Sequence, residues 1–269
     1  MTRFWTLRYS GYMRRRAFFQ LTVSSLTVSS TVGWLRALEP TGSSIVDRFV
    51  DVTGGKAAYS RVTSELAEGM VNMGAQGVSG SVKLFKKAGN SYTVIEIEGV
   101  GKLEEGVVGG VAWENNKITG ARVRLGEERD MHIRNAAIDL DHQWRKYFPT
   151  AEMAGSETVA GEDCQKVIMR PKSGEPETRF FSKKTGLLLK MSATMPTQMG
   201  PMPMESTMAD YREVQGVKRP FKLGIMAGGQ SAEMVFSKWT INGAIPATAF
   251  TLPPEVASLV PKVAAKPAK

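Results

Sequence analysis

The stretch TRFFSKKTGLLLKMS, residues 178–192, joins two apolar runs through a polar turn that ends in glycine. A four-residue loop over 183–186, with Gly186 in the left-handed conformation, is typical of a β-hairpin. In the simplest register Phe180 pairs with Leu189. One face of this hairpin is then apolar: Phe180, Leu187, Leu189 and Met191. We expect that face to point inward, either as ordinary core or as the wall of a pocket for a lipophilic molecule.

The same alternation of apolar and polar residues runs along most of the chain. It begins near residue 62, pauses at 124–148 and resumes up to residue 242. Gly or Asn turns divide it into segments of about ten residues, which is the spacing of consecutive antiparallel strands. The sequence therefore predicts a mostly β, α+β fold built on one large, strongly curved antiparallel sheet.

Two helical regions accompany the predicted strands. Ser43-Ser44 is predicted as the N-cap of a helix, and Gly54-Gly55 ends it. The apolar residues at helical spacing between them are Ile45, Val46, Phe49 and Val50. Residues 124–148 are predicted as a helical insertion that Pro149 ends. Its last aromatic residues, Trp144, Tyr147 and Phe148, are expected to plug the open side of the sheet, which would leave a small or closed cavity.

A second hairpin, DYREVQGVKRPF, turns at Gln215-Gly216. Its simplest register places Glu213 opposite Lys218 and Arg212 opposite Arg219. Like charges that face each other are destabilising unless an anion lies between them. Arg212 and Arg219 are therefore candidates for an anion contact, and the alternative is that both side chains extend into water.

Methionine is concentrated just after the opening hairpin, in the stretch MSATMPTQMGPMPMESTM (residues 191–208). Its ends belong to the predicted strands LLLKMSATM (187–195) and MESTMADYREV (204–214), and a methionine-rich loop is predicted between them. Three interpretations stay open. The thioethers pack on the mouth of the barrel, or they form an adaptable apolar lid over a lipophilic ligand. The third is binding of Cu(I), a metal that prefers soft ligands.

Charge is concentrated at the two ends of the chain. The formal net charge is +9, and residues 1–36 contain six arginines and no acidic residue. Without these six the charge is +3, which matches Lys262, Lys266 and Lys269 in the tail. The body is therefore close to neutral and has no basic stripe of the kind that nucleic-acid binding needs. Nucleic acid is thus excluded as a leading partner.

The first 37 residues have the layout of an export signal. Arg15-Arg16-Ala17-Phe18-Phe19-Gln20 resembles the twin-arginine motif, and a weakly apolar, Ser/Thr-rich run follows it. That run is short for a membrane span. We therefore expect a periplasmic protein with no stable transmembrane segment after signal removal.

No arrangement of residues typical of catalysis is present in the sequence. The two histidines, His132 and His142, lie in no HExxH pattern, and neither a Gly-x-Ser-x-Gly elbow nor a P-loop occurs. Asp139, Asp141 and His142 (DLDH) are expected at a solvated helix edge rather than at a metal. The single cysteine, Cys164, lies in a predicted strand and is expected to be buried. The sequence predicts no enzyme, no cofactor and no metal site.

Several motifs occur in a familiar order: FVDVTGGKAA, GGVAWENN, VAGEDCQKVIM, RFFSKKTGLLLKM, DYREVQGVKRPF and INGAIPATAFTLPP. This order resembles the bacterial outer-membrane lipoprotein-sorting (lipoprotein carrier) superfamily, and within it the exported relatives of uncharacterised function. The resemblance covers residues 43–255. It implies an unclosed β-barrel covered by helices, with an apolar space that receives acyl chains in the true carriers. No ligand-contacting residue transfers position by position, so the resemblance supports the fold more than the ligand.

The leading hypothesis is an exported, non-enzymatic carrier that holds an acyl chain or other lipophilic ligand, with a role in lipid or lipoprotein trafficking. Its partners would be that ligand or a lipid-modified protein, and an envelope protein. The alternatives are an envelope-assembly module with a filled core and a Cu(I)-binding protein. The predicted division is an export signal at 1–37, one domain at 43–255 and a disordered tail at 256–269. The candidate cavity or rim residues are Phe180, Leu187, Leu189, Met191, Trp113, Trp144, Met199, Met202 and Met204, with Arg212 and Arg219 as the anion contact.

Overall fold

The computed structural model describes residues 40–74, 77–117 and 119–260. They belong to a compact unit, Glu39–Lys269, that is separate from Met1–Leu38. The predicted export signal therefore lies outside the described residues, as do residues 261–269 of the predicted tail. Residues 256–260 are described, and Val256 is fully buried in a short helix, so ordered structure continues beyond the predicted domain end at 255.

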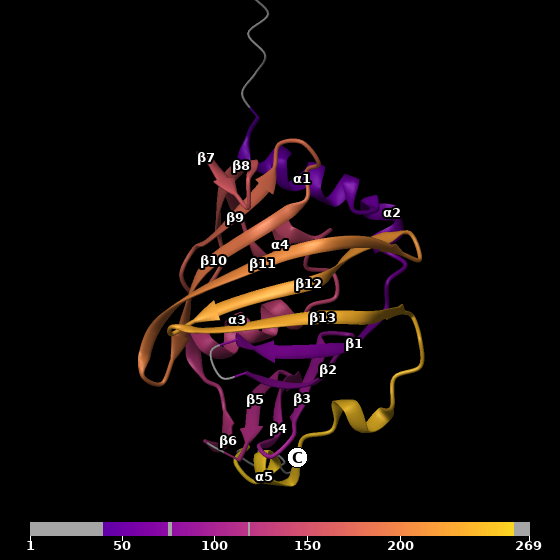
Figure 1. Cartoon of the computed structure of the whole chain (residues 1–269), viewed down its shortest axis with the longest axis vertical. Coiled ribbons are helices and arrows are strands. Elements are labelled where there is room, and N and C mark those ends of the chain that lie inside the picture. Colours follow the sequence, from indigo (N-terminus) through magenta and orange to yellow (C-terminus); the bar gives the residue numbers. More distant parts are fainter. Residues whose placement is uncertain (1–39, 75–76, 118, 261–269) are drawn as a thin grey trace, which may run out of the picture. The chain divides into compact units, whose positions relative to one another are not determined.

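Thirteen strands of the described chain form one sheet in which all neighbours are antiparallel (Figure 1). The first six are β1 (Ser64–Met73), β2 (Val78–Lys87), β3 (Asn90–Ile97), β4 (Gly101–Val108), β5 (Val111–Asn116) and β6 (Gly120–Val123). The others are β7 (Thr150–Val159), β8 (Glu162–Arg170), β9 (Glu177–Ser182), β10 (Leu188–Thr197), β11 (Gly200–Val214), β12 (Val217–Ala227) and β13 (Gln230–Ile241).

The order of the strands leaves the sheet unclosed. Two meanders, β1 to β6 and β7 to β13, join where β1 pairs with β13, and the edges are β6 and β7. This confirms the predicted fold class, an unclosed barrel with few helices. The short strand β6 was not predicted.

Helices cover one face of the sheet, which we call the concave face. They are α1 (Gly42–Val52), α2 (Gly55–Tyr59), α3 (Gly126–Ala136) and α4 (Trp144–Tyr147); the 3₁₀ helix η2 (Ala247–Phe250) and α5 (Pro254–Ala257) follow the last strand. α1 packs on β7 and β8, while α3 packs on β3, β4, β5 and β10. In Figure 1, α3 and α4 are seen behind strands β10 to β13. Over the described residues, no helix has the length and apolar character needed to cross a membrane.

The sequence of α1 explains its two ends. The hydroxyl of Thr41 accepts a hydrogen bond from the amide of Ser44 (3.1 Å), so the N-cap lies two residues before the predicted Ser43-Ser44. At the other end the Thr53 hydroxyl donates to the carbonyl of Phe49 at 2.6 Å, and Gly54 has a φ of 140°. A Cβ at Gly54 would lie 2.5 Å from the carbonyl oxygen of Gly216, so only glycine fits there.

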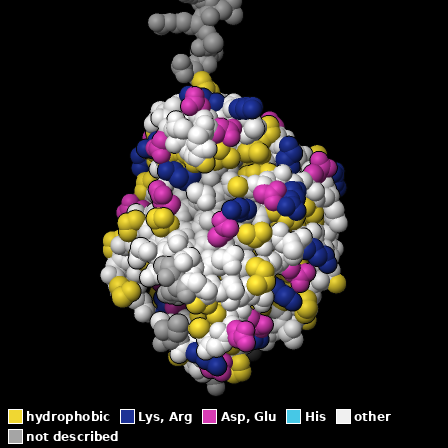
Figure 2. All heavy atoms as spheres, viewed as in Figure 1, with side chains coloured by type: hydrophobic (Ala, Val, Ile, Leu, Met, Phe, Trp, Pro, Cys, Tyr) yellow, Lys and Arg dark blue, Asp and Glu magenta, His cyan; other side chains and the backbone are white. Residues whose placement is uncertain are grey.

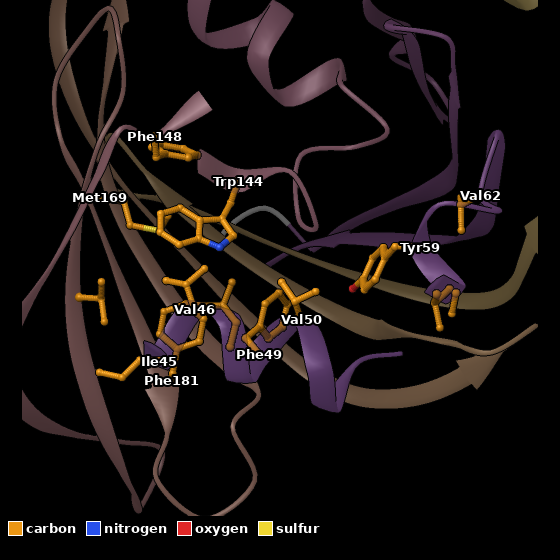
Figure 3. Packing of buried hydrophobic residues seen from close by; sticks show 14 of the residues in the cluster. Ile45, Val46, Phe49, Val50, Tyr59, Val62, Trp144, Phe148, Met169 and Phe181 are labelled. Atoms are coloured by element: carbon orange, nitrogen blue, oxygen red, sulfur yellow. The ribbon is translucent and has the colours of Figure 1, made fainter. Parts of the chain in front are cut away.

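The buried face of α1 fills one end of the concave face. Its predicted apolar residues pack with Trp144, Phe148, Met169 and Phe181 in one cluster (Figure 3). The rings of Phe49 and Phe181 lie 5.6 Å apart. The predicted plug is confirmed, since Trp144 and Phe148 are buried and Tyr147 packs against the same cluster.

The opening hairpin has the predicted turn but a different register. The amide of Gly186 donates to the carbonyl of Ser182 at 2.9 Å. A bulge then places Lys190, rather than Leu189, opposite Phe180. One extra residue moves the following side chains to the other face. The prediction for Phe180 and Leu189 was therefore wrong: Phe181 and Leu188 belong to the main core, whereas Phe180 and Leu189 pack in a separate cluster with Val159 and the buried Cys164.

The methionine-rich stretch contains a shorter loop than predicted. It forms the ends of β10 and β11, in which Met195 lies opposite Met202 and the chain turns at Gln198 and Met199. Two of its prolines, Pro196 and Pro201, lie opposite each other near that turn. Proline is tolerated where ladder hydrogen bonds are dispensable, so its presence did not end the strands.

The predicted helix at 124–148 is interrupted. α3 ends at Ala136, Ala137 adopts an extended conformation (φ −67°, ψ 124°), and turns continue to α4. Asp139, within these turns, accepts hydrogen bonds from the Lys146 ammonium group and from the Tyr147 hydroxyl. These contacts hold the irregular segment 137–143, which we call the cover segment, against α4.

Candidate functional site

A cavity of about 250 Å³ lies between the cover segment and the concave face. Four residues of the cover segment line it, and strands β11, β12 and β13 provide most of the opposite wall. Its lining consists of Phe49, Glu65, Lys86, Ala137, Ile138, Leu140, Asp141, Leu188, Met208, Tyr211, Lys218, Arg219, Pro220, Leu223 and Trp239. Apolar side chains with a few polar groups are typical of ligand cavities, and this volume is close to the lower end of their range of roughly 300–1,000 Å³.

Neighbouring strands position the apolar wall. Met208 of β11 lies directly opposite Leu223 of β12, so both side chains extend from the same face of the sheet. Tyr211 follows on β11, and its hydroxyl donates to the carbonyl of Leu188 at 2.8 Å. Burial raises the pKa of Tyr211, which keeps this phenol neutral. The part of the wall formed by Met208, Leu223 and Tyr211 is therefore apolar apart from one phenol whose donor is already satisfied, while Lys218 and Arg219 of β12 also line the cavity.

A buried charged cluster, consisting of Arg219, Glu65, Tyr59 and Asp141, adjoins this wall. Arg219 donates from Nε to Oε1 of Glu65 at 2.8 Å and from Nη1 to the Tyr59 hydroxyl at 3.2 Å. Its Nη1 also lies 3.7 Å from Oδ2 of Asp141. Arg219 and Glu65 are only 7% and 8% exposed. The guanidinium is thus neutralised on two sides by carboxylates.

The surroundings of the cluster fix its protonation. Burial opposes the charge on Arg219, but Glu65, Tyr59 and Asp141 outweigh burial and raise its pKa. Burial, with the carboxylate of Asp141, raises the pKa of Tyr59 to about 12. The Tyr59 hydroxyl therefore remains protonated. It accepts a hydrogen bond from Arg219 and lies 2.9 Å from the hydroxyl of Thr53.

The cover segment is held from both sides. On one side, Asp139 accepts a hydrogen bond from Nζ of Lys146 in α4 at 2.9 Å. Asp141 faces Arg219, and the ring of His142 stacks on Tyr59 with 5.6 Å between ring centroids. The DLDH stretch is therefore occupied with structural contacts, and the predicted solvated helix edge is instead a half-buried turn. The described residues contain no group of three His, Cys, Asp or Glu side chains that could hold a metal ion.

Of the eleven site residues predicted from the sequence, only Arg219 lines the cavity. Trp144 lies in the packed core, where its indole N–H donates to Asp47 at 3.0 Å. Trp113 is fully buried in β5, with its ring 6.1 Å from that of Tyr92. Leu187 lies half-buried beside the turn of the opening hairpin.

The predicted methionines lie along the β10–β11 hairpin. Met191 and Met204 line a narrow hollow of about 20 Å³ beside α3. Met202 is half-buried, and Met199, at the tip, is 97% exposed. None of them lines the cavity under the cover segment.

The predicted register of the second hairpin is confirmed, with Arg212 opposite Arg219 and Glu213 opposite Lys218. The two guanidinium groups nevertheless have separate partners. Arg219 binds the carboxylates described above, while Arg212 is exposed, bonds to Asp210 from Nε at 2.9 Å and lies 4.4 Å from the centre of the Phe221 ring. Their mutual repulsion is thus relieved by protein carboxylates.

Most residues of the cavity wall were not predicted from the sequence. The confirmed register of the second hairpin contained a usable signal, since alternation along β12 places Leu223 on the same face as Arg219. Glu65, Trp239 and the cover residues carried no such signal, because strands and turns distant in sequence bring them together.

A second charged cluster lies away from the cavity. Arg124 is buried and bonds through Nη2 to carboxylate oxygens of Glu105 and Glu114, each at 2.7 Å. Its Nε bonds to Glu128 at 3.1 Å, and its Nη1 lies 3.3 Å from His132. Burial lowers the pKa of His132, which favours the neutral imidazole. These contacts tie α3 to β4, β5 and the residues after β6, and they give His132 a structural role.

Larger hollows lie on the surface. One of about 450 Å³ lies over β1, β11, β12 and β13, and one of about 590 Å³ lies by the ends of β4, β5 and β6. On the face in view, Figure 2 shows acidic and basic side chains interspersed without a basic stripe. This face therefore has no footprint for nucleic acid.

Solved structures of other proteins share this fold. No family model and no curated protein matches the sequence. A DUF1329 family protein from Desulfovibrio piger gives a TM-score of 0.53 at 16% identity, and the match covers 82% of this chain and 100% of that chain. A LolA superfamily protein from Nitrosomonas europaea gives a TM-score of 0.52 at 12% identity, with 79% and 98% covered. The chain therefore shares the fold of these two proteins, one of which belongs to the LolA superfamily, and this is the fold that its motifs indicated.

Proposed function

We propose that the chain is a non-enzymatic binding protein of the cell envelope that holds an acyl chain or another lipophilic molecule in the cavity under the cover segment. The observation that supports the proposal is the cavity itself, whose lining is mostly apolar with five charged residues and which the irregular cover segment bounds on one side. The arginine-rich start of the chain favours export to the periplasm, where a role in lipid or lipoprotein trafficking would be exercised.

Hydrophobic transfer would drive capture. The cavity of about 250 Å³ holds roughly eight groups of the size of a water molecule, at about 30 Å³ each. Each methylene removed from water contributes about 0.8 kcal/mol, so a chain segment of this length contributes about 6 kcal/mol before the cost of association. A longer chain would fit only if the cover segment moved away from the sheet.

A lipid-uptake experiment tests this function. The delipidated protein is titrated with a fluorescent fatty acid, and lipids copurifying from the native envelope are identified by mass spectrometry. Leu223→Trp should fill the cavity and weaken uptake at least tenfold, and Met208→Phe should do the same to a smaller extent. Met199→Trp is the matched control, because its side chain is 97% exposed at the hairpin tip.

Two results would count against a carrier. Wild-type protein that takes up no probe and carries no lipid would leave the alternative of an envelope-assembly module, which the dense packing around Trp144 favours (Figure 3). Unchanged uptake by a folded Leu223→Trp variant would place binding elsewhere. Thermal unfolding followed by circular dichroism checks that each variant folds.

Cu(I) binding is a second candidate function, and the register of the β10–β11 hairpin favours it. Met195 lies opposite Met202, and Met204 lies two residues further on the same face of the strand. Three thioethers on one face are suitable ligands for Cu(I). In a titration with Cu(I) under reducing conditions, the double variant Met202→Leu/Met204→Leu should bind the metal more weakly than the single variant Met199→Leu. Equal binding by the two variants would refute this candidate.

A further inference from the structure

The charges that line the cavity are not balanced. Two carboxylates, Glu65 and Asp141, face three cations, and both carboxylates are directed to Arg219. Of the other two cations, Lys86 donates to the carbonyl oxygen of Asn135 at 2.8 Å. Across the described part of the chain, no carboxylate lies within 4 Å of either Lys86 or Lys218, and both are half-buried. The lining therefore has a net charge of +1, located on Lys86 and Lys218; Lys218 lies opposite the exposed Glu213 in the sheet, but the two do not come within ion-pair distance.

A second observation indicates a missing hydrogen-bond acceptor. The indole N–H of Trp239, which lines the same cavity, is buried and has no hydrogen-bond partner among the described residues. A buried indole donor usually has a partner, and an unsatisfied one costs free energy. Four other residues of the described chain, Trp113, His132, Arg134 and His142, also have a buried polar atom without a partner, but none of these four lines the cavity.

The volume limits the number of chains. About 250 Å³ accommodates one chain of roughly eight to ten carbon atoms, if a methylene takes up about the 30 Å³ of a water molecule. A molecule with two or three long acyl chains exceeds this volume several times. The apolar wall formed by Met208 and Leu223 suits a single saturated segment.

From these three observations we infer that the cavity takes a monoanionic, single-chain amphiphile, namely a medium-chain carboxylate. Its carboxylate lies by Lys86 and Lys218, and its chain lies along Met208 and Leu223. This inference rests on the proposed function and adds the charge, the chain number and the length of the ligand.

Competition with the fluorescent probe tests the inference on the wild-type protein. The competitors are decanoate, decanol, decyltrimethylammonium, palmitate and a two-chain phosphatidylglycerol, each below its aggregation concentration. Decanoate should bind at least tenfold more tightly than decanol, and the cationic amphiphile should bind most weakly. Raising the salt concentration from 0.1 to 1 M should weaken the binding of decanoate and leave the binding of decanol unchanged.

Variants locate the head group. Lys86→Met and Lys218→Met, made separately and together, should weaken decanoate binding by up to tenfold each and leave decanol unchanged. Trp239→Phe removes the indole donor and should weaken the binding of both ligands a few-fold. Lys87→Met is the matched control, because this exposed lysine is the neighbour of Lys86 on β2 and does not line the cavity.

The outcomes separate this inference from the function on which it rests. Equal affinities for decanoate and decanol, without salt dependence, would overturn the anionic head group. Tighter binding of phosphatidylglycerol than of decanoate would overturn the inference that the ligand has a single chain, while the proposal of lipid binding would stand. Binding of none of the competitors or of the probe would overturn both.

Discussion

Two neighbouring regions under the same sheet differ in how they are covered. At one end α1 and α4 bring Phe49, Trp144 and Phe148 onto β8 and β9, and the space is filled. Beside it the cover segment brings only short aliphatic side chains and Asp141 over β11 to β13, and about 250 Å³ remains. A regular helix presents a row of large side chains to the sheet, whereas the turns at 137–143 do not. Whether the sheet encloses a core or a cavity is therefore decided locally by the covering segment.

The largest effect should come from the filled region. Trp144→Ala should lower the free energy of unfolding by about 3–5 kcal/mol, because it removes a ring that is 2% exposed and its hydrogen bond to Asp47. Leu223→Ala, which borders the cavity and is half-buried, should cost only about 1 kcal/mol. Urea denaturation measures both values. Equal costs would show that the two regions are packed alike and would remove the contrast.

The next effect concerns the charged cluster beside the cavity. Glu65→Gln leaves buried Arg219 with only the more distant Asp141, and we expect a loss of about 3 kcal/mol, since an uncompensated buried charge is costly. Glu68→Gln on the same strand is the control. Its contacts with Lys83 and Lys238, at 3.5 and 4.0 Å, are exposed and contribute about 0–1 kcal/mol. A Glu65→Gln protein as stable as this control would mean that Arg219 is solvated through the cavity.

The smallest effect depends on pH. The folded state holds the proton of Tyr59 more tightly than the unfolded state, because its pKa is raised from 10.0 to about 12. This contribution to stability is complete below pH 10 and is lost as the pH rises from 10 to 12, by about 1.4 kcal/mol per pH unit. Tyr59→Phe should cost about 1 kcal/mol at neutral pH, for two lost hydrogen bonds.

Above pH 10 the stabilities of the wild type and Tyr59→Phe should therefore converge. Chemical denaturation at pH 8, 9, 10 and 11 measures the difference between them. Parallel curves across this range would contradict a buried, protonated Tyr59, and they would indicate that water enters the cluster from the cavity.

Local pattern was sufficient for most of the fold. Twelve of the thirteen strands of the described chain lie within segments where apolar and polar residues alternate or at their ends, and the apolar spacing of Ile45, Val46, Phe49 and Val50 marked α1 correctly. The register at Arg212 and Arg219 followed from a two-residue turn. Errors arose where a local rule had an exception. The bulge at Leu189 changed the pairing in the opening hairpin, so the predicted inward face of that hairpin was wrong. Prolines near the ends of β10 and β11 made both strands look shorter in the sequence than they are.

The candidate site was predicted much less well, because its residues are far apart in the sequence. Glu65 and Arg219 are 154 residues apart, and their ion pair exists only because β1, β13 and β12 are neighbours in the sheet. The methionines attracted attention by composition, yet none of Met191, Met199, Met202 and Met204 lines the cavity.

The sequence by itself determined the fold class, the antiparallel meander and the helix that fills one end of the sheet, since each depends on periodicity and turn chemistry within about ten residues. Only the tertiary structure decided where space remains and which charges line it. A cavity is the difference between the volume that the sheet encloses and the volume of the side chains that several distant segments place there, and no single segment specifies that difference.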